Sequence, residues 1–231
     1  MQNPHILEIS VETVEAAVAA ERGGAGRIEL CQELGVGGLT PGVQLMRATR
    51  EQVRLPIFAM IRPRGGNFVY SGAEFNSMRN DIAAAKRHGM NGIVLGILKQ
   101  DRRVDVERTR ELVELARPLA ATFHRAFDES ADLHESLEDV IKTGAARILT
   151  SGGAPTAPEG LAMLAKLLAT SGGRIIIVPG SGLNPSNILG VARETKAREF
   201  HSGLSSVLSQ TETDCVQFAA QVRKLASELA R

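Results

Sequence analysis

Charged and imidazole side chains interrupt several short apolar runs of this sequence. In the segment from Ala121 to Asp128, an apolar run breaks into His124, Arg125 and Asp128. Four other apolar runs are interrupted in a similar way, at Glu8, Glu29, Arg62 and His201. A single histidine at the end of a buried strand is often only a packed core residue. Because the interruption recurs in five runs, it indicates side chains gathered at one site.

Glu8 and Glu29 are acidic side chains that we expect to face a common interior. Side chains alternate along a strand, so both point away from their apolar neighbours, and Cys31 shares the face of Glu29. A buried carboxylate without a partner costs several kcal/mol, so each must meet a basic side chain, a metal ion or a proton. Two carboxylates opposite two imidazoles are the composition expected for general acid and base catalysis on a small substrate. The candidate catalytic residues are Glu8, Glu29, His124 and Asp128.

A second group of residues could recognise an anion. Arg62 and Arg64 can hold an anion through paired hydrogen bonds. The Gly180–Gly182 turn precedes Pro185, where we expect a helix to begin, and backbone N–H groups at such a start hold phosphate in many barrels. We therefore expect a small phosphate- or carboxylate-bearing ligand, and the candidate substrate-binding residues are Arg62, Arg64, Arg125, Gly180, Ser181, Gly182 and His201.

The same side chains would also suit a hard or borderline metal ion. Cys31 is the one thiol expected to face the interior, and the candidate metal ligands are Cys31, His124 and His201. Cu(I) sites normally gather two or more thiolates or thioethers, but the sequence has no Cys-x-x-Cys motif and no methionine-rich run. We expect Glu29 and Glu33 to raise the pKa of Cys31, which disfavours a cysteine nucleophile.

An inert ion-pair layer is the alternative to a functional site. In that arrangement the arginines would neutralise the carboxylates across the mouth of the fold, and the protein would be a scaffold. The pairs would join Arg62, Arg64 and Arg125 to Glu8, Glu29 and Asp128.

The apolar runs predict the fold that positions these residues. Eight runs, separated by helix-length segments, recur about every 27 residues and start near Ile6, Arg27, Pro56, Gly92, Leu119, Ala146, Arg174 and Arg198. Eight βα units close most economically as a barrel, so we predict an α/β protein with a single (β/α)8 TIM barrel domain over residues 1–231. A doubly wound sheet is the alternative, but no G-x-G-x-x-G fingerprint follows the first run.

Capping residues predict where several of the helices begin and end. A helix rich in alanine begins near Thr13 and ends at the Gly23–Gly24 pair, and another runs from Asp105 to Arg117. The last helix, from Asp214 to Leu229, places Cys215 on its apolar face, so we expect this cysteine in the core. Two long loops, at 32–41 and 62–72, follow strands and belong to the face where barrel active sites lie.

Composition limits the classes of partner. The 231 residues contain 27 Lys and Arg against 26 Asp and Glu, so no strong field favours nucleic acid or an anionic membrane. The N-terminal residues lack a basic region, and no apolar run approaches the 18 residues of a membrane span. Two dissimilar cysteines do not suggest a disulfide framework. We expect a cytoplasmic protein whose partners are small molecules or further copies of itself.

Seven ordered segments of the chain resemble the copper homeostasis protein CutC family, from Leu7 to about Gly203. The segments are LEI at 7–9, RIELC at 27–31, GGLTP at 37–41, RPRGG at 62–66, TFHRAFD at 122–128, LTSGG at 149–153 and HSG at 201–203. Asn67 departs from the Asp that is usual in the family, so we leave it out of the site. The resemblance implies a single (β/α)8 barrel, a cytoplasmic location, a homodimer or higher homo-oligomer, and copper binding in copper homeostasis, with Cu(I) as the implied cofactor. The residues themselves favour the alternative, a metabolic enzyme acting by acid and base chemistry on a small anionic substrate.

Overall fold

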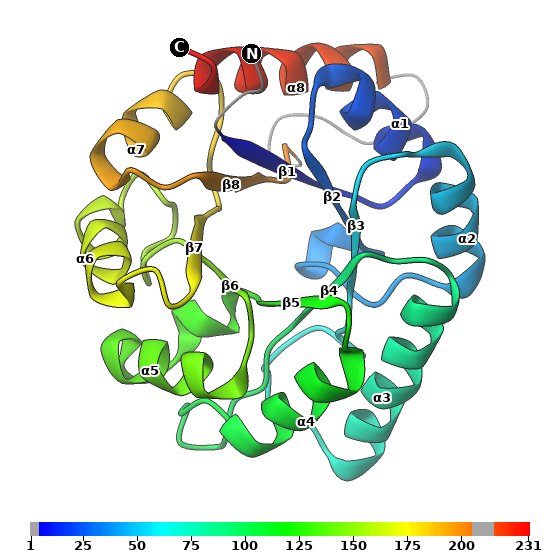
Figure 1. Cartoon of the computed structure of the whole chain (residues 1–231), viewed down its shortest axis with the longest axis vertical. Helices are drawn as coiled ribbons and strands as arrows, with labels where there is room; N and C mark the ends of the chain where they lie inside the picture. Colours follow the sequence, from blue (N-terminus) through cyan, green and yellow to red (C-terminus); the bar gives the residue numbers. More distant parts are fainter. Residues whose placement is uncertain (1–4, 205–214) are drawn as a thin grey trace.

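The computed structural model describes residues 5–204 and 215–231, which form one (β/α)8 barrel (Figure 1). The strands of these two segments are β1 (Ile6–Val11), β2 (Arg27–Leu30), β3 (Ile57–Met60), β4 (Gly92–Leu95), β5 (Ala120–Phe123), β6 (Arg147–Thr150), β7 (Ile176–Pro179) and β8 (Glu199–Ser202). The α-helices are α1 (Val14–Gly23), α2 (Val43–Gln52), α3 (Gly72–Arg87), α4 (Val106–Ala116), α5 (Leu133–Thr143), α6 (Leu161–Ser171), α7 (Ile188–Thr195) and α8 (Cys215–Leu229). Two short 3-10 helices, η1 (Leu34–Val36) and η2 (Arg125–Glu129), follow β2 and β5.

The strands form a parallel sheet in the order β7-β6-β5-β4-β3-β2-β1-β8. In Figure 1 they enclose the centre of the molecule and the helices surround them. Strands β7 and β8 are in contact and nearly close the ring. The predicted TIM barrel is therefore confirmed.

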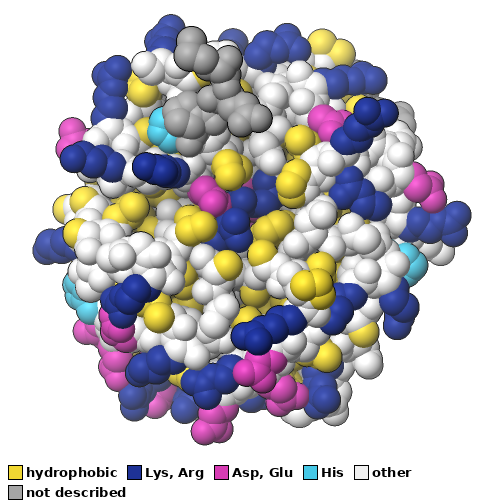
Figure 2. Space-filling model, in the orientation of Figure 1, with side chains coloured by type: hydrophobic (Ala, Val, Ile, Leu, Met, Phe, Trp, Pro, Cys, Tyr) yellow, Lys and Arg dark blue, Asp and Glu magenta, His cyan; other side chains and the backbone are white. Residues whose placement is uncertain are grey.

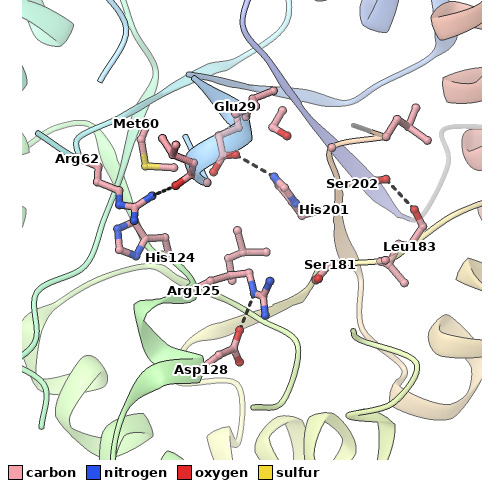
Figure 3. Close-up of a pocket in the computed structure, with 18 of the residues that line it drawn as sticks. Glu29, Met60, Arg62, His124, Arg125, Asp128, Ser181, Leu183, His201 and Ser202 are labelled. Atoms are coloured by element: carbon pink, nitrogen blue, oxygen red, sulfur yellow. Dashed lines mark hydrogen bonds and ion pairs between the residues drawn. The ribbon is translucent and has the colours of Figure 1, made fainter. Parts of the chain in front are cut away.

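Alternation along the strands separates an apolar outer face from a polar interior. Side chains such as Ile9, Ile28 and Phe123 are completely buried in the apolar cluster that the helices share with the sheet. Glu29 points the other way, into the cavity of the barrel (Figure 3), and Glu8 bonds to the buried side chain of Arg27. The parallel register then fixes which interior side chains are neighbours, since Glu8 is aligned with Arg27 on one side and with His201 on the other. The barrel thus brings residues that are far apart in sequence to one axis.

Helix boundaries follow the predicted caps in two cases. The Thr13 side chain accepts from the Ala16 N–H at the start of α1, and Gly24 ends that helix in a left-handed conformation. The Asp105 side chain likewise accepts from the Arg108 N–H at the start of α4. Each cap satisfies backbone groups that have no partner within the helix.

The predicted start of a helix at Pro185 is wrong. Helix α7 begins at Ile188, because residues around Asn184 form a side-chain-stabilised turn first. The Asn184 carbonyl oxygen of the side chain accepts from the Ser186 N–H at 2.9 Å, and the Asn187 side chain accepts from the Asn184 N–H at 2.9 Å. Asparagine side chains of this kind compete with the backbone ladder of a helix.

Helix α8 buries one face against the barrel. Phe218, Val222, Leu225 and Leu229 are buried, as predicted, and α8 packs against α1. Cys215 is only partly buried at the first position of the helix, where it packs against the edge of the core. Asp214 lies outside the described residues. Within the segments 5–204 and 215–231, no helix combines the length and apolar character required to cross a membrane.

A buried ion-pair layer fills the interior below the mouth of the barrel. Arg27 donates to a Glu8 oxygen and, at 2.7 Å, to a Glu199 oxygen, which also accepts from Arg147 at 2.8 Å. The ring of Phe58 faces both guanidinium groups, 4.9 Å from Arg27 and 5.4 Å from Arg147. Burial lowers the pKa of Arg27, but the charges of Glu8 and Glu199 outweigh it and hold this pKa above its ordinary value. The interior ion-pair layer exists, but of the expected residues it contains only Glu8, which is joined there by Arg27, Arg147 and Glu199. The expected pair of Arg125 with Asp128 also forms, outside this layer.

Candidate functional site

A cavity of about 460 Å³ opens at the carboxyl ends of the strands, which is the face where barrel enzymes place their sites. Figure 2 shows the hollow at the centre of this face, where basic and acidic side chains meet within a rim of hydrophobic ones. Eight of the predicted site residues line it: Glu29, Arg62, His124, Arg125, Asp128, Ser181, Gly182 and His201. Glu8, Cys31, Arg64 and Gly180 do not line it.

Glu29 is the centre of one wall of this mouth cavity. One carboxylate oxygen, Oε2, is 2.9 Å from Nε2 of His201 and accepts from the Cys31 thiol at 3.7 Å (Figure 3). The other oxygen, Oε1, is buried without a partner. Burial alone would raise the pKa of Glu29, but His201 outweighs it and holds this pKa below its ordinary value, while Glu29 holds the pKa of His201 above its own. The two side chains therefore form a pair in which each stabilises the charged form of the other.

His124, on the opposite wall, is held in its neutral form. Burial and the nearby Arg62 cation lower its pKa to about 3. Its Nδ1 accepts from the Ala126 N–H at 3.2 Å, which leaves the proton of the neutral ring on Nε2. That nitrogen is buried and has no partner. The ring fits only because residue 96 is glycine, since a Cβ there would lie 2.5 Å from Nδ1.

Arg62 is anchored by backbone carbonyls. One terminal nitrogen donates to Val36 O at 2.9 Å and to Gly38 O at 3.3 Å, and the other donates to Gly66 O at 2.9 Å. The side chain is 5% exposed, and its Nε has no partner. Within residues 5–204 and 215–231 no carboxylate pairs with it. Arg62 is thus a buried cation whose charge is not neutralised by an acidic side chain of the described chain.

Arg64 does not join Arg62 in a clamp, contrary to the sequence-based expectation. Its guanidinium donates to a Glu74 oxygen at 2.6 Å and stacks on the ring of Tyr70, 5.2 Å from the ring centre. It also donates to Val69 O at 2.7 Å, within its own loop. Strand β3 ends at Met60, so the alternation of side chains along a strand does not place Arg64 on the face of Arg62.

Asp128 is occupied as a structural acceptor. Its oxygens accept from Arg125 Nε at 2.8 Å, from the backbone N–H groups of Ser151 at 3.0 Å and Gly153 at 2.9 Å, and from the Thr150 hydroxyl. These bonds fasten η2 to the loop after β6. Both oxygens of this carboxylate are engaged by these donors, which disfavours the predicted catalytic role.

In the Gly180–Gly182 turn, one of the expected backbone donors is already occupied. The Gly180 N–H donates to Thr150 O at 3.0 Å, and the Ser181 hydroxyl donates to Pro155 O at 2.9 Å. Ser181 and Gly182 still line the cavity, both in left-handed conformations. Because α7 starts later than expected, no helix N-terminus points from this turn.

Two sulfur side chains, Cys31 and Met60, belong to one small apolar cluster in the barrel. Cys31 is completely buried in a small cluster with Phe58, Met60 and Val94. Burial raises the pKa of its thiol well above the ordinary value, with further contributions from Glu29, Glu8 and Glu12. Met60 does line the cavity. The sequence analysis did not select Met60, although it shares a strand face with Arg62.

Among the described residues, two carboxylates and one imidazole that could bind a metal ion gather at one point. Donor atoms of Glu8, Glu29 and His201 all lie within 4.8 Å of one another, as the ligands of a metal ion would. Neither Cys31 nor His124 belongs to this group. The predicted ligand set of Cys31, His124 and His201 is therefore not assembled, and His201 alone is common to both sets.

Comparison with known proteins places the chain in a family. The model of the CutC family matches residues 5–206. A CutC family protein of Chromobacterium violaceum is 47% identical over 197 residues, covering 85% of this chain and 80% of the relative. The human copper homeostasis protein cutC homolog is 40% identical over 232 residues, covering 95% and 85%. The crystal structure of a putative copper homeostasis protein CutC from Streptococcus agalactiae superposes with a TM-score of 0.80 at 30% identity, covering 86% of this chain and 98% of that one. This chain therefore belongs to the CutC family.

Proposed function

We propose that this protein acts in cytoplasmic copper homeostasis by binding a copper ion at the inner end of the mouth cavity. The observation that carries the proposal is the group formed by Glu8, Glu29 and His201, whose donor atoms lie within 4.8 Å of one another beside the Cys31 thiol. Copper homeostasis is the role named for the human and mouse relatives. The proposal brings that role to this chain.

The donor types support binding of either copper oxidation state. Carboxylate oxygens and an imidazole suit Cu(II), whereas a thiolate and a thioether suit Cu(I). Glu29 is hydrogen-bonded to both His201 and Cys31, so it joins the two kinds of donor. A copper ion bound here would displace the protons of the imidazolium and the thiol, because both ligands bind metal only when deprotonated.

Cys31→Ser should weaken Cu(I) binding by about 100-fold or more, since it removes the one thiolate near the proposed site. His201→Gln should weaken it by roughly 10- to 100-fold. Competition with a chromophoric chelator measures both affinities. Cys215→Ser is the matched control, because Cys215 lies on α8, away from the mouth cavity. Equal affinities for Cys31→Ser, Cys215→Ser and the parent would contradict the proposed copper site.

Acid and base chemistry on a small anionic molecule is the second candidate function. The observation that favours it is the pairing of Glu29 with His201 on the wall opposite His124, around one cavity. In such a pair the carboxylate can accept a proton from a substrate, and the imidazole can return a proton to it. Oxygen Oε1 of Glu29 has no partner among the described residues, so its lone pairs are not committed within the protein.

A thermal-shift screen of carboxylated and phosphorylated metabolites should find a stabilising ligand. A ligand at 100 times its dissociation constant adds about 2.7 kcal/mol to the free energy of unfolding, which raises the melting temperature measurably. Glu29→Gln should keep that shift and lose turnover of the ligand, because it removes the proton acceptor but preserves the shape. If no compound in a broad library raises the melting temperature, the second candidate function fails.

We also propose that the protein forms a homodimer or higher homo-oligomer, as the family resemblance implies. Light scattering coupled to size-exclusion chromatography should then give a mass that is a multiple of the 24.7 kDa chain. A mass of one chain at micromolar concentration would contradict this.

A further inference from the structure

We infer that Arg62 and His124 form a recognition site for the carboxylate group of a small organic acid, to which both side chains donate hydrogen bonds in the mouth cavity. This inference deepens the second candidate function and its biological meaning rests on that function. Binding at the site requires no proton transfer, however, and can be tested separately. It does not involve the residues proposed to bind copper.

The first observation is the uncompensated charge of Arg62. A buried guanidinium ordinarily lies against a carboxylate, because an unpaired charge in the interior is costly. Arg62 instead donates to three backbone carbonyls, which bind its terminal nitrogens but bring no negative charge. The nearby Tyr70 hydroxyl makes no hydrogen bond of good geometry with it, and Tyr70 is not in the cavity lining. An anion in the cavity would supply the missing charge.

The second observation is the unpartnered donor of His124. Because the Ala126 N–H occupies Nδ1, the neutral ring carries its proton on Nε2, where it faces no acceptor among the residues that the structure describes. A buried N–H group without an acceptor is destabilising, and native proteins rarely leave one unless a water or ligand binds it. His124 is 4% exposed and lines the cavity. Its Nε2 is therefore a donor without an acceptor at the wall of the cavity, and because this atom is shielded from solvent, binding of a carboxylate requires a small shift of the ring.

The third observation is that the two donors are adjacent. Both side chains pack on the ring of Phe68, with the Arg62 Cζ 4.8 Å and the His124 ring 4.9 Å from the ring centre. Figure 3 shows the His124 ring beside the Arg62 guanidinium on one wall of the cavity. Their proximity also explains why the Arg62 cation lowers the pKa of His124. Two neighbouring donors on one wall match the two oxygens of a planar carboxylate.

The charges around the cavity favour a carboxylate over a phosphate. Arg62 supplies one uncompensated positive charge, whereas Arg125 is already bound to Asp128 and to the Ser151 hydroxyl. The carboxylate of Glu29 lines the opposite wall and would repel a dianion. The Gly180 N–H is also occupied, so the turn expected to bind phosphate lacks that donor. A monovalent carboxylate on a small molecule therefore fits the site.

Long-range ¹H–¹⁵N NMR of histidine-labelled, metal-free protein tests the site directly. Without ligand, His124 should be neutral with its proton on Nε2 near pH 7. Pyruvate, glycolate and oxalate at millimolar concentrations should each shift the Nε2 resonance in a saturable way, while neutral pyruvamide should not. Arg62→Met should weaken the binding of these carboxylates at least tenfold. Arg64→Met is the matched control, because Arg64 lies two residues away but outside the cavity, and it should leave binding unchanged.

Several outcomes would overturn the inference. One is a proton on Nδ1 of His124, and another is the absence of a saturable shift with all three carboxylates. The inference also fails if inorganic phosphate binds more tightly than the carboxylates, or if Arg62→Met binds them as well as Arg64→Met does. If Arg62→Met does not fold, His124→Phe serves instead, and it should also bind the carboxylates at least tenfold more weakly. Glu29→Gln separates this inference from the proposed acid and base chemistry. It should keep carboxylate binding whether or not the protein turns over any substrate.

Discussion

Replacing Arg27 by methionine should destabilise the fold by about 3–5 kcal/mol, because it leaves the Glu8 carboxylate buried without its partner. Glu8 is 1% exposed, and Arg27 is its ion-pair partner in the interior layer. A domain of this kind is stable by about 5–15 kcal/mol in total, so the variant should lose a large part of its stability. Denaturant unfolding followed by circular dichroism measures the change. Glu199 retains Arg147 and is affected less.

The double variant Glu8→Gln with Arg27→Met should recover most of the loss, since it removes both charges together. Arg47→Met is the surface control, because Arg47 and its partner Glu51 are both well exposed and such pairs contribute about 0–1 kcal/mol. If Arg27→Met unfolds at the same denaturant concentration as Arg47→Met, the buried layer has no structural role. If the double variant is as unstable as the single one, the loss comes from packing rather than from charge.

Lowering the pH should decrease the free energy of unfolding through His124, before the carboxylates of the protein are titrated. The pKa of this imidazole falls from an ordinary value of 6.5 to about 3 in the folded state. Between these values the unfolded chain binds a proton that the folded chain does not, so the free energy of unfolding rises with pH and decreases as the pH is lowered. A shift of this size corresponds to a decrease of roughly 4–5 kcal/mol between pH 7 and pH 3.

His124→Gln should flatten this part of the profile, because glutamine cannot take up the proton in either state. Unfolding free energies measured at intervals between pH 7 and pH 4 give the slope for each protein. His134→Gln is the control, since His134 lies on the exposed side of α5, and it should keep the parental slope. A parental slope in His124→Gln would mean that other groups cause the acid sensitivity.

The sequence predicted the barrel, and the side chains that face its interior, better than it predicted which side chains form ion pairs and hydrogen bonds with one another. Alternation along β2 correctly placed Glu29 in the interior, and the parallel register brings His201 near it. Alternation reports a face of the sheet, however, and not the depth along the barrel axis. Glu8 therefore lies one layer below the mouth, paired with Arg27, which the apolar pattern assigned only as the start of a strand.

Beyond the ends of the strands, the alternation of apolar and polar residues does not predict where side chains point. Arg64 follows Arg62 by two residues, but the chain is no longer extended there, and its side chain turns to Glu74. The closeness of the His124 ring to Gly96 depends on packing between two strands, which a single sequence does not encode locally. Met60 was recognisable from its shared face with Arg62, but an isolated methionine is ordinarily a core residue, and nothing in the sequence distinguished it.

The way in which Arg62 is anchored leaves the loops at the mouth of the barrel free to change in sequence among related proteins. The guanidinium is bonded to carbonyl groups of the two long loops, at Val36, Gly38 and Gly66, and every amino acid carries a carbonyl group. Side chains of these loops can therefore be exchanged during evolution without releasing the arginine, provided that the backbone path is kept. Gly37, Gly38 and Gly66 are exceptions, because their left-handed conformations disfavour other residues. A fixed cation surrounded by replaceable loop side chains would allow one scaffold to acquire new ligands while the basis of charge recognition stays the same.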